Sequence, residues 1–104
     1  MKTFIYQLKL DPRLYEESAW TDVDNKAVEL HYLRLKEDFE KGKIIHVGRT
    51  EDPTYDGFGI VIFYAENLEE AHHYMLEDPA VKGGQMTAKV FSYKQAFHQS
   101  KLNL

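Results

Sequence analysis

Four apolar residues follow one another without a break at Ile60-Val61-Ile62-Phe63. Successive side chains of a β-strand point to opposite faces of its sheet, so an unbroken apolar run predicts a strand that is buried on both faces. A sheet built around such a strand needs an apolar layer on each side. This requirement constrains the fold more than any other feature of the chain.

Three other segments have the branched and aromatic composition of strands and are bounded by turn residues. They cover residues 4–10, 44–48 and 85–93, and the apolar run belongs to a strand within 56–64. Residues 11–21 have no clear period and predict a long loop.

Two segments carry helical signals. The first is predicted to begin at a cap formed by Asp22 or Asp24 and to end at about Lys41, before Gly42. The second opens at a capping signal, Asn67-Leu68-Glu69-Glu70, and ends near residue 77, ahead of Pro79. One face of the first helix is predicted to hold Val28, Tyr32, Leu35 and Phe39, and one face of the second to hold Leu68, Ala71 and Met75.

The order of these elements is β-α-β-β-α-β, which predicts a ferredoxin-like α+β fold with an antiparallel sheet and both helices on one face. A chain of 104 residues is long enough for one domain of this kind. We assign residues 1–98 to that domain and expect residues 99–104 to form a polar tail.

The second face of the sheet has no layer within the chain. Ile5, Phe91 and Tyr93 are predicted to lie on that face, together with half of the run at 60–63. We therefore expect a homodimer in which a second copy packs sheet against sheet. The alternative is a monomer whose apolar face is solvated.

The same strand resembles the octamer with which RNA recognition motifs stack bases, and the matching residues are Gly57, Phe58, Gly59, Val61 and Phe63. Two positions disagree, because Asp56 replaces the basic residue that contacts phosphate and Ile60 replaces a stacking aromatic ring. The net charge of −4 also provides no attraction for a polyanion. A nucleic-acid partner is not predicted.

Composition and motif spacing argue against metal-binding, cofactor-dependent and membrane proteins. The chain has no cysteine, no histidine pair at helical metal-binding spacing and no glycine-rich phosphate loop, so no metal or cofactor is predicted. No apolar run approaches the roughly 18 residues that cross a bilayer, and the first residues are too briefly apolar for a signal peptide. A cytoplasmic protein without a membrane partner is expected.

Two side chains are candidates for chemistry. His31 lies beside the apolar face of the first helix, at the boundary of core and solvent, which suits either a packed structural histidine or a functional one. Asp78 precedes Pro79 just past the second helix, where it forms either a simple turn or a carboxylate that needs donors nearby. Because both helices cover the same face, His31 is placed to supply such a donor.

Several short motifs resemble those of the YciI-like proteins, small members of the dimeric α+β barrel superfamily. The matching segments are His31–Leu35 with Gly42, Val47-Gly48, Gly57, Asn67–Ala71, Asp78–Val81 and Ala88–Phe91. The resemblance implies that His31 and Asp78 form the active-site pair. The family often has an arginine where this chain has Val28 and a proline where it has Arg49.

A carboxylate that orients an imidazole makes a proton shuttle near neutral pH. The sequence therefore predicts a small-molecule enzyme with an isomerase- or lyase-like acid/base mechanism, in which His31 and Asp78 are catalytic. The side chains expected to line its pocket are Phe4, Tyr6, Trp20, Arg49 and Tyr55, with Trp20 and Tyr15 as a lid or as anchors of the loop. The alternative is a non-catalytic dimeric module that binds a small ligand or a partner.

Overall fold

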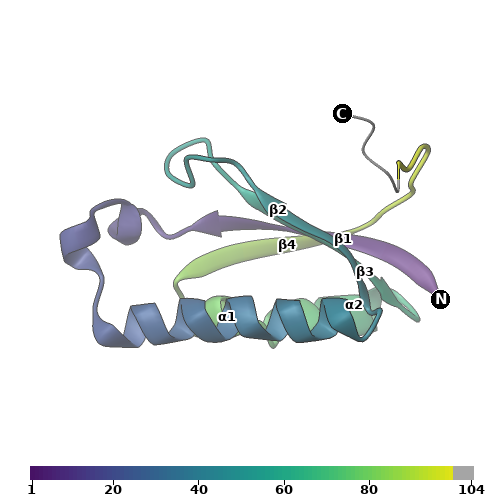
Figure 1. Cartoon of the computed structure of the whole chain (residues 1–104), viewed down its shortest axis with the longest axis horizontal. Coiled ribbons are helices and arrows are strands. Elements are labelled where there is room, and N and C mark those ends of the chain that lie inside the picture. The colour runs from purple at the N-terminus through teal and green to yellow at the C-terminus, as the bar shows by residue number, and fades with distance from the viewer. Residues whose placement is uncertain (100–104) are drawn as a thin grey trace.

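The computed structural model describes residues 1–99 and has the predicted order of main elements (Figure 1). Of the predicted tail at 99–104, all but Gln99 lies outside the described residues. The elements are β1 (Lys2–Leu10), η1 (Pro12–Tyr15), η2 (Glu17–Ala19), α1 (Asp22–Glu40), β2 (Ile44–Arg49), β3 (Gly59–Ala65), α2 (Leu68–Leu76), α3 (Pro79–Lys82) and β4 (Met86–Ser92). Within residues 1–99, no helix is long and apolar enough to cross a membrane.

The four strands form one antiparallel sheet in the order β2-β3-β1-β4, with the helices on one side (Figure 1). This arrangement confirms the predicted ferredoxin-like fold. Phe4 and Tyr6 of β1 pair with Phe63 and Val61 of β3, and all four side chains are buried beneath the helices. Helix α2 packs on β1, β3 and β4, whereas α1 contacts β2 and α3.

The segment between β1 and α1 is more ordered than the predicted loop. It forms two short 3₁₀ helices, η1 and η2, and Leu14 of η1 is buried. The prediction that Asp22 or Asp24 caps α1 is wrong, because the N-cap is Thr21. Thr21 caps the helix by accepting a hydrogen bond from Asp24 N, and the Asp24 carboxylate accepts one from Thr21 N in return.

Asp24 also ties this segment to the rest of the fold. Its carboxylate accepts two hydrogen bonds from Arg13, at 2.8 and 2.9 Å, and one of 3.0 Å from Gln85 Nε2. The Arg13 bonds, followed by those of Gln85 and Thr21, hold the pKa of Asp24 far below its usual range. One carboxylate thus joins η1, the start of α1 and the residue that precedes β4.

Two predicted apolar faces differ from the observed ones. In α2, Ala71 and Met75 are buried as expected, but Leu68 is half exposed because the helix begins there. In α1, Leu35 is buried, whereas Tyr32 and Phe39 are more than half exposed. Helix α1 makes few contacts with the central strands, so this face borders a pocket rather than a packed core.

The outer face of the sheet is mixed in character. Ile62, Ile5 and Phe91 are paired across β3, β1 and β4 and form an apolar row, in which Phe91 is 50% exposed. The next row along β1 and β4 contains Gln7 and Lys89. The apolar part of this face is therefore narrower than the sequence alone indicates.

Candidate active site

The structure brings His31 and Asp78 into direct contact. His31 Nδ1 lies 2.7 Å from Asp78 Oδ1 and 2.8 Å from Oδ2. The histidine comes from the middle of α1 and the aspartate from the junction of α2 and α3, and α1 packs against α3. The His31 side chain is 13% exposed and that of Asp78 is fully buried.

Asp78 has two further donors besides the imidazole. The Tyr6 hydroxyl donates to Oδ2 at 2.7 Å, and Ala80 N donates to Oδ1 at 2.9 Å. Asp78 is therefore the N-cap of α3, a position that favours a carboxylate. The sequence left open a simple turn or a carboxylate that needs donors, and the structure shows a carboxylate with three donors at the start of a short helix.

The environment of Asp78 favours its ionised form. Burial raises the pKa of the carboxyl group, but the hydrogen bond and charge of His31 and the bonds from Tyr6 and Ala80 outweigh it, so the pKa lies below the usual value. Burial, followed by the charge and hydrogen bond of Asp78, raises the pKa of the Tyr6 hydroxyl above its usual value. Tyr6 therefore stays protonated and remains a donor.

This charge state determines which nitrogen of His31 carries a proton. An ionised carboxylate only accepts hydrogen bonds, so we infer that Nδ1 carries the proton it donates to Asp78. Nε2 is then the ring nitrogen that is free to exchange a proton. His31 also lines a pocket, so this nitrogen is the one available for chemistry there.

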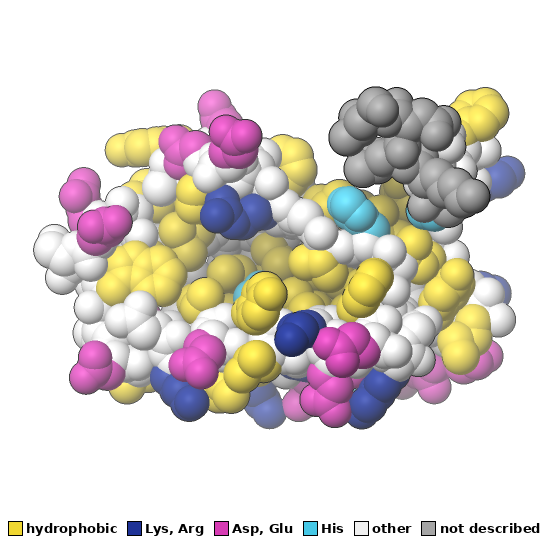
Figure 2. All heavy atoms as spheres, viewed as in Figure 1, with side chains coloured by type: hydrophobic (Ala, Val, Ile, Leu, Met, Phe, Trp, Pro, Cys, Tyr) yellow, Lys and Arg dark blue, Asp and Glu magenta, His cyan; other side chains and the backbone are white. Residues whose placement is uncertain are grey.

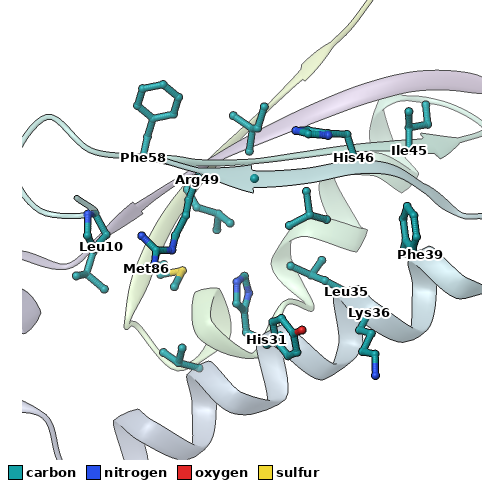
Figure 3. Close-up of a pocket in the computed structure, with 18 of the residues that line it drawn as sticks. Leu10, His31, Leu35, Lys36, Phe39, Ile45, His46, Arg49, Phe58 and Met86 are labelled. Atoms are coloured by element: carbon teal, nitrogen blue, oxygen red, sulfur yellow. The ribbon is translucent and has the colours of Figure 1, made fainter. Parts of the chain in front are cut away.

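The pocket lies between α1 and the sheet and has a volume of about 800 Å³. Figure 2 shows it as a hollow lined largely by hydrophobic side chains, with Lys or Arg side chains at its rim. In Figure 3, His31 projects from α1 toward the sheet, and Arg49, Leu10 and Met86 project from the strands toward the helix. These side chains meet in the same space.

The five residues predicted to line the pocket are distributed differently in the structure. Trp20 and Arg49 do line it. Phe4 and Tyr6 point from β1 into the core, where Phe4 packs near Phe63. The Tyr6 hydroxyl donates a hydrogen bond to Asp78 from within the core. Tyr55 lies on the exposed turn after β2 and does not line the pocket. Its ring packs against that of Tyr15, tilted by 49°, with the centroids 4.8 Å apart.

The loop aromatics act as anchors. Trp20 Nε1 donates a 2.9 Å hydrogen bond to the carbonyl oxygen of Leu14, which is itself buried. Tyr15 is held against Tyr55. Trp20 therefore forms a wall of the pocket.

Several pocket residues were assigned to the core by sequence reasoning. Val28, Tyr32 and Phe39 on α1 were predicted to pack on the sheet, and they line the pocket instead. Leu10 and Met86, paired at the ends of β1 and β4, complete its far end. The spacing of the α1 residues predicts an apolar face of the helix. Periodicity does not show whether such a face packs on a sheet or borders a cavity.

Among residues 1–99, no group of three or more His, Asp or Glu side chains is arranged to hold a metal ion. The ionisable side chains that line the pocket are His31, whose Nδ1 contacts the buried Asp78, and Arg49, Lys36, His46 and Tyr32.

The structure is similar to that of 5-chloro-2-hydroxyhydroquinone dehydrochlorinase (TftG) from Burkholderia phenoliruptrix AC1100, solved in complex with 2,5-dihydroxybenzoquinone. The two chains are 22% identical, with a TM-score of 0.59, and the match covers 90% of this chain and 95% of that one. This likeness shows the fold, and it agrees with the ferredoxin-like α+β arrangement that the sequence and the YciI-like resemblance imply. No protein-family model and no curated protein matches the chain.

We expect the substitution Tyr6→Phe to lower the free energy of unfolding by about 1–3 kcal/mol, because it removes a donor from a buried carboxylate. Urea denaturation measures this change. Tyr64→Phe is the matched control, since that hydroxyl makes no hydrogen bond within the described part of the chain. Equal stability of the two variants would show that the Tyr6–Asp78 bond contributes nothing.

Proposed function

We propose that the protein is a small-molecule enzyme that uses His31 and Asp78 as a general acid/base pair. The observation that supports this most directly is the fully buried Asp78 carboxylate holding His31 Nδ1 while the imidazole borders an apolar pocket. Asp78 fixes the tautomer and stabilises the imidazolium that forms when Nε2 takes a proton.

The reaction class follows from the groups at the pocket. Nε2 removes a proton from a carbon next to a carbonyl or similar group, which takes up the electron pair. Return of the proton to a different atom completes an isomerisation, and departure of a leaving group as an anion completes an elimination. The matched protein of this fold is named a dehydrochlorinase, and loss of HCl likewise includes removal of a proton.

Solvent exchange tests this proposal without knowledge of the natural substrate. The protein is incubated in D₂O with hydroxylated and halogenated aromatic compounds and cyclic enones, and ¹H NMR records their C–H signals. We expect the protein to accelerate deuterium incorporation, isomerisation or elimination in at least one of them. A compound that binds in the pocket with none of these reactions would identify a non-catalytic ligand-binding module instead.

We also propose that the protein forms a homodimer through the outer face of the sheet. The support is the apolar row of Ile62, Ile5 and Phe91, which ends in a half-exposed aromatic ring that no helix covers. Packing this row against its equivalent in a second copy would remove the exposed part of Phe91 from water, in the symmetric manner typical of homodimers.

The substitution Phe91→Glu is expected to convert this dimer to a monomer, because it places two carboxylates in a symmetric apolar contact. Sedimentation velocity at low micromolar concentration measures the change. Leu68→Glu is the control, since Leu68 is equally exposed but lies at the start of α2, on the other side of the sheet. A wild-type chain that sediments as a monomer would refute the dimer.

A further inference from the structure

We propose that the pocket beside His31 binds a hydrophobic organic anion, with the carboxylate or phenolate of the ligand on Arg49 and its apolar body between α1 and the sheet. This inference deepens the proposed function by naming the substrate class, and it depends on the same pocket.

The charges around the pocket carry the inference. The chain has 17 acidic and 13 basic residues, yet no Asp or Glu of the described residues lines the pocket. Its ionisable side chains are His31, Tyr32, Lys36, His46 and Arg49, none of which is acidic at neutral pH. The pocket wall therefore has basic but no acidic side chains, although the chain as a whole is acidic. A wall of this kind attracts an anionic ligand.

Arg49 is the cation best placed to bind that anion. Its Nη1 donates 2.8 Å hydrogen bonds to the carbonyl oxygens of Thr50 and Glu51, which fix the guanidinium in place. Neither Nε nor Nη2 hydrogen-bonds to residues 1–99, and no carboxylate in this range lies within salt-bridge distance. The guanidinium therefore keeps donors for a carboxylate or phenolate, and it points toward the helix that carries His31 (Figure 3).

Lys36 is a weaker candidate for this role. Its ammonium group lies 3.9 Å from a Glu40 carboxylate oxygen. In Figure 3 its side chain extends from α1 away from the sheet. Arg49 is thus the pocket cation whose charge is available to a ligand.

The remaining walls select an apolar body. Leu8, Leu10, Trp20, Leu35 and Met86 surround the space between Arg49 and His31 with hydrophobic side chains. A pocket of about 800 Å³ has room for a fused bicyclic ring system. With its charge on Arg49, such a ligand extends toward His31, where proton transfer would occur.

Calorimetric titration with a matched set of naphthalene compounds tests the inference. The probes are 2-naphthoate, the neutral 2-naphthamide and the cationic 2-naphthylmethylammonium. We expect wild-type protein to bind the naphthoate at least about tenfold more tightly than the other two, as for a hydrogen bond to a charged group. Equal affinity for naphthoate and naphthamide would overturn the inference.

Two substitutions assign the preference to Arg49. Arg49→Gln should weaken naphthoate binding by about tenfold or more with little effect on naphthamide, and Arg49→Lys should restore part of the preference. Lys26→Gln makes the same change in net charge on the exposed part of α1 and should leave both affinities unchanged. If Arg49→Gln does not fold, Arg49→Lys and the wild-type comparison of the probes still decide the matter. Unaltered naphthoate affinity in a folded Arg49→Gln variant would refute the assignment.

These titrations need no turnover, so the two proposals can fail separately. Absence of proton-exchange chemistry with an intact naphthoate preference overturns only the acid/base function. Turnover that depends on His31, combined with no preference for the anion, overturns only the ligand class.

Discussion

The substitution His31→Asn is expected to reduce the rate of ligand proton exchange by about 10² to 10⁴, the usual contribution of a general acid/base. The amide nitrogen of asparagine takes the place of Nδ1 and can still donate to Asp78. The variant lacks only the second ring nitrogen, Nε2, which we propose exchanges the proton. We therefore expect the loss to appear in the rate of the chemical step, with the fold and the pocket preserved.

The rate is measured by ¹H NMR in D₂O with whichever compound the wild-type protein processes. His72→Asn, an identical substitution on the exposed surface of α2, is the control and should exchange at the wild-type rate. A folded His31→Asn protein with undiminished exchange would exclude the imidazole as the acid/base group.

The substitution Asp78→Ala is expected to lower the free energy of unfolding by about 3–5 kcal/mol. It leaves the Tyr6 hydroxyl, Ala80 N and His31 Nδ1 without their acceptor in a fully buried place. Since a domain of this size has a total stability of about 5–15 kcal/mol, urea denaturation should show a large shift. A loss below about 1 kcal/mol would mean that water replaces the carboxylate.

Asp78→Asn separates stability from catalysis at the same position. Its carbonyl oxygen still accepts from Tyr6 or Ala80, so this variant should be more stable than Asp78→Ala. Its amide group donates to Nδ1, however, which leaves the proton on Nε2 and removes the base. We therefore expect a folded protein that has lost exchange activity.

The acid sensitivity of the wild-type protein provides an independent check on Asp78. Because the fold lowers the pKa of this carboxyl group, its stabilising contribution is complete above the ordinary value of about 4. The contribution is lost as the pH falls through the lowered value of the folded state. Urea denaturation at a series of acidic pH values should show this loss in the wild-type protein and a shallower dependence in Asp78→Ala.

Sequence patterns predicted the fold well because they report local preferences. The alternation in residues 4–10, the unbroken run at 60–63 and the capping signal at Asn67 each follow from side-chain periodicity or hydrogen bonding within a few residues. The contact between His31 and Asp78 joins residues 47 positions apart. It was anticipated because the topology puts both helices on one face and because of the family resemblance.

Which side chains line the pocket depends on the distances between helices and strands, and the periodicity of the sequence does not report these distances. Nothing in the β1 sequence distinguishes Tyr6, which reaches Asp78 from the core, from a residue that lines a cavity. The same limit applies to Phe39. The sequence pattern of an apolar helical face is the same whether the helix packs on the sheet or is separated from it by a cavity. The α3 cap at Asp78 was missed because a helix of 4 residues leaves almost no periodic signal.

The junction at Asp24 has a consequence for how a ligand enters. Hydrogen bonds from Arg13, Thr21 and Gln85 to Asp24 hold both ends of the segment that carries Trp20. The wall of the pocket that Trp20 forms is therefore fixed in place. Tyr32 and Phe39, in contrast, border the pocket and are largely open to solvent. We therefore expect small molecules to enter the pocket past these two rings, without unfolding of the segment that carries Trp20.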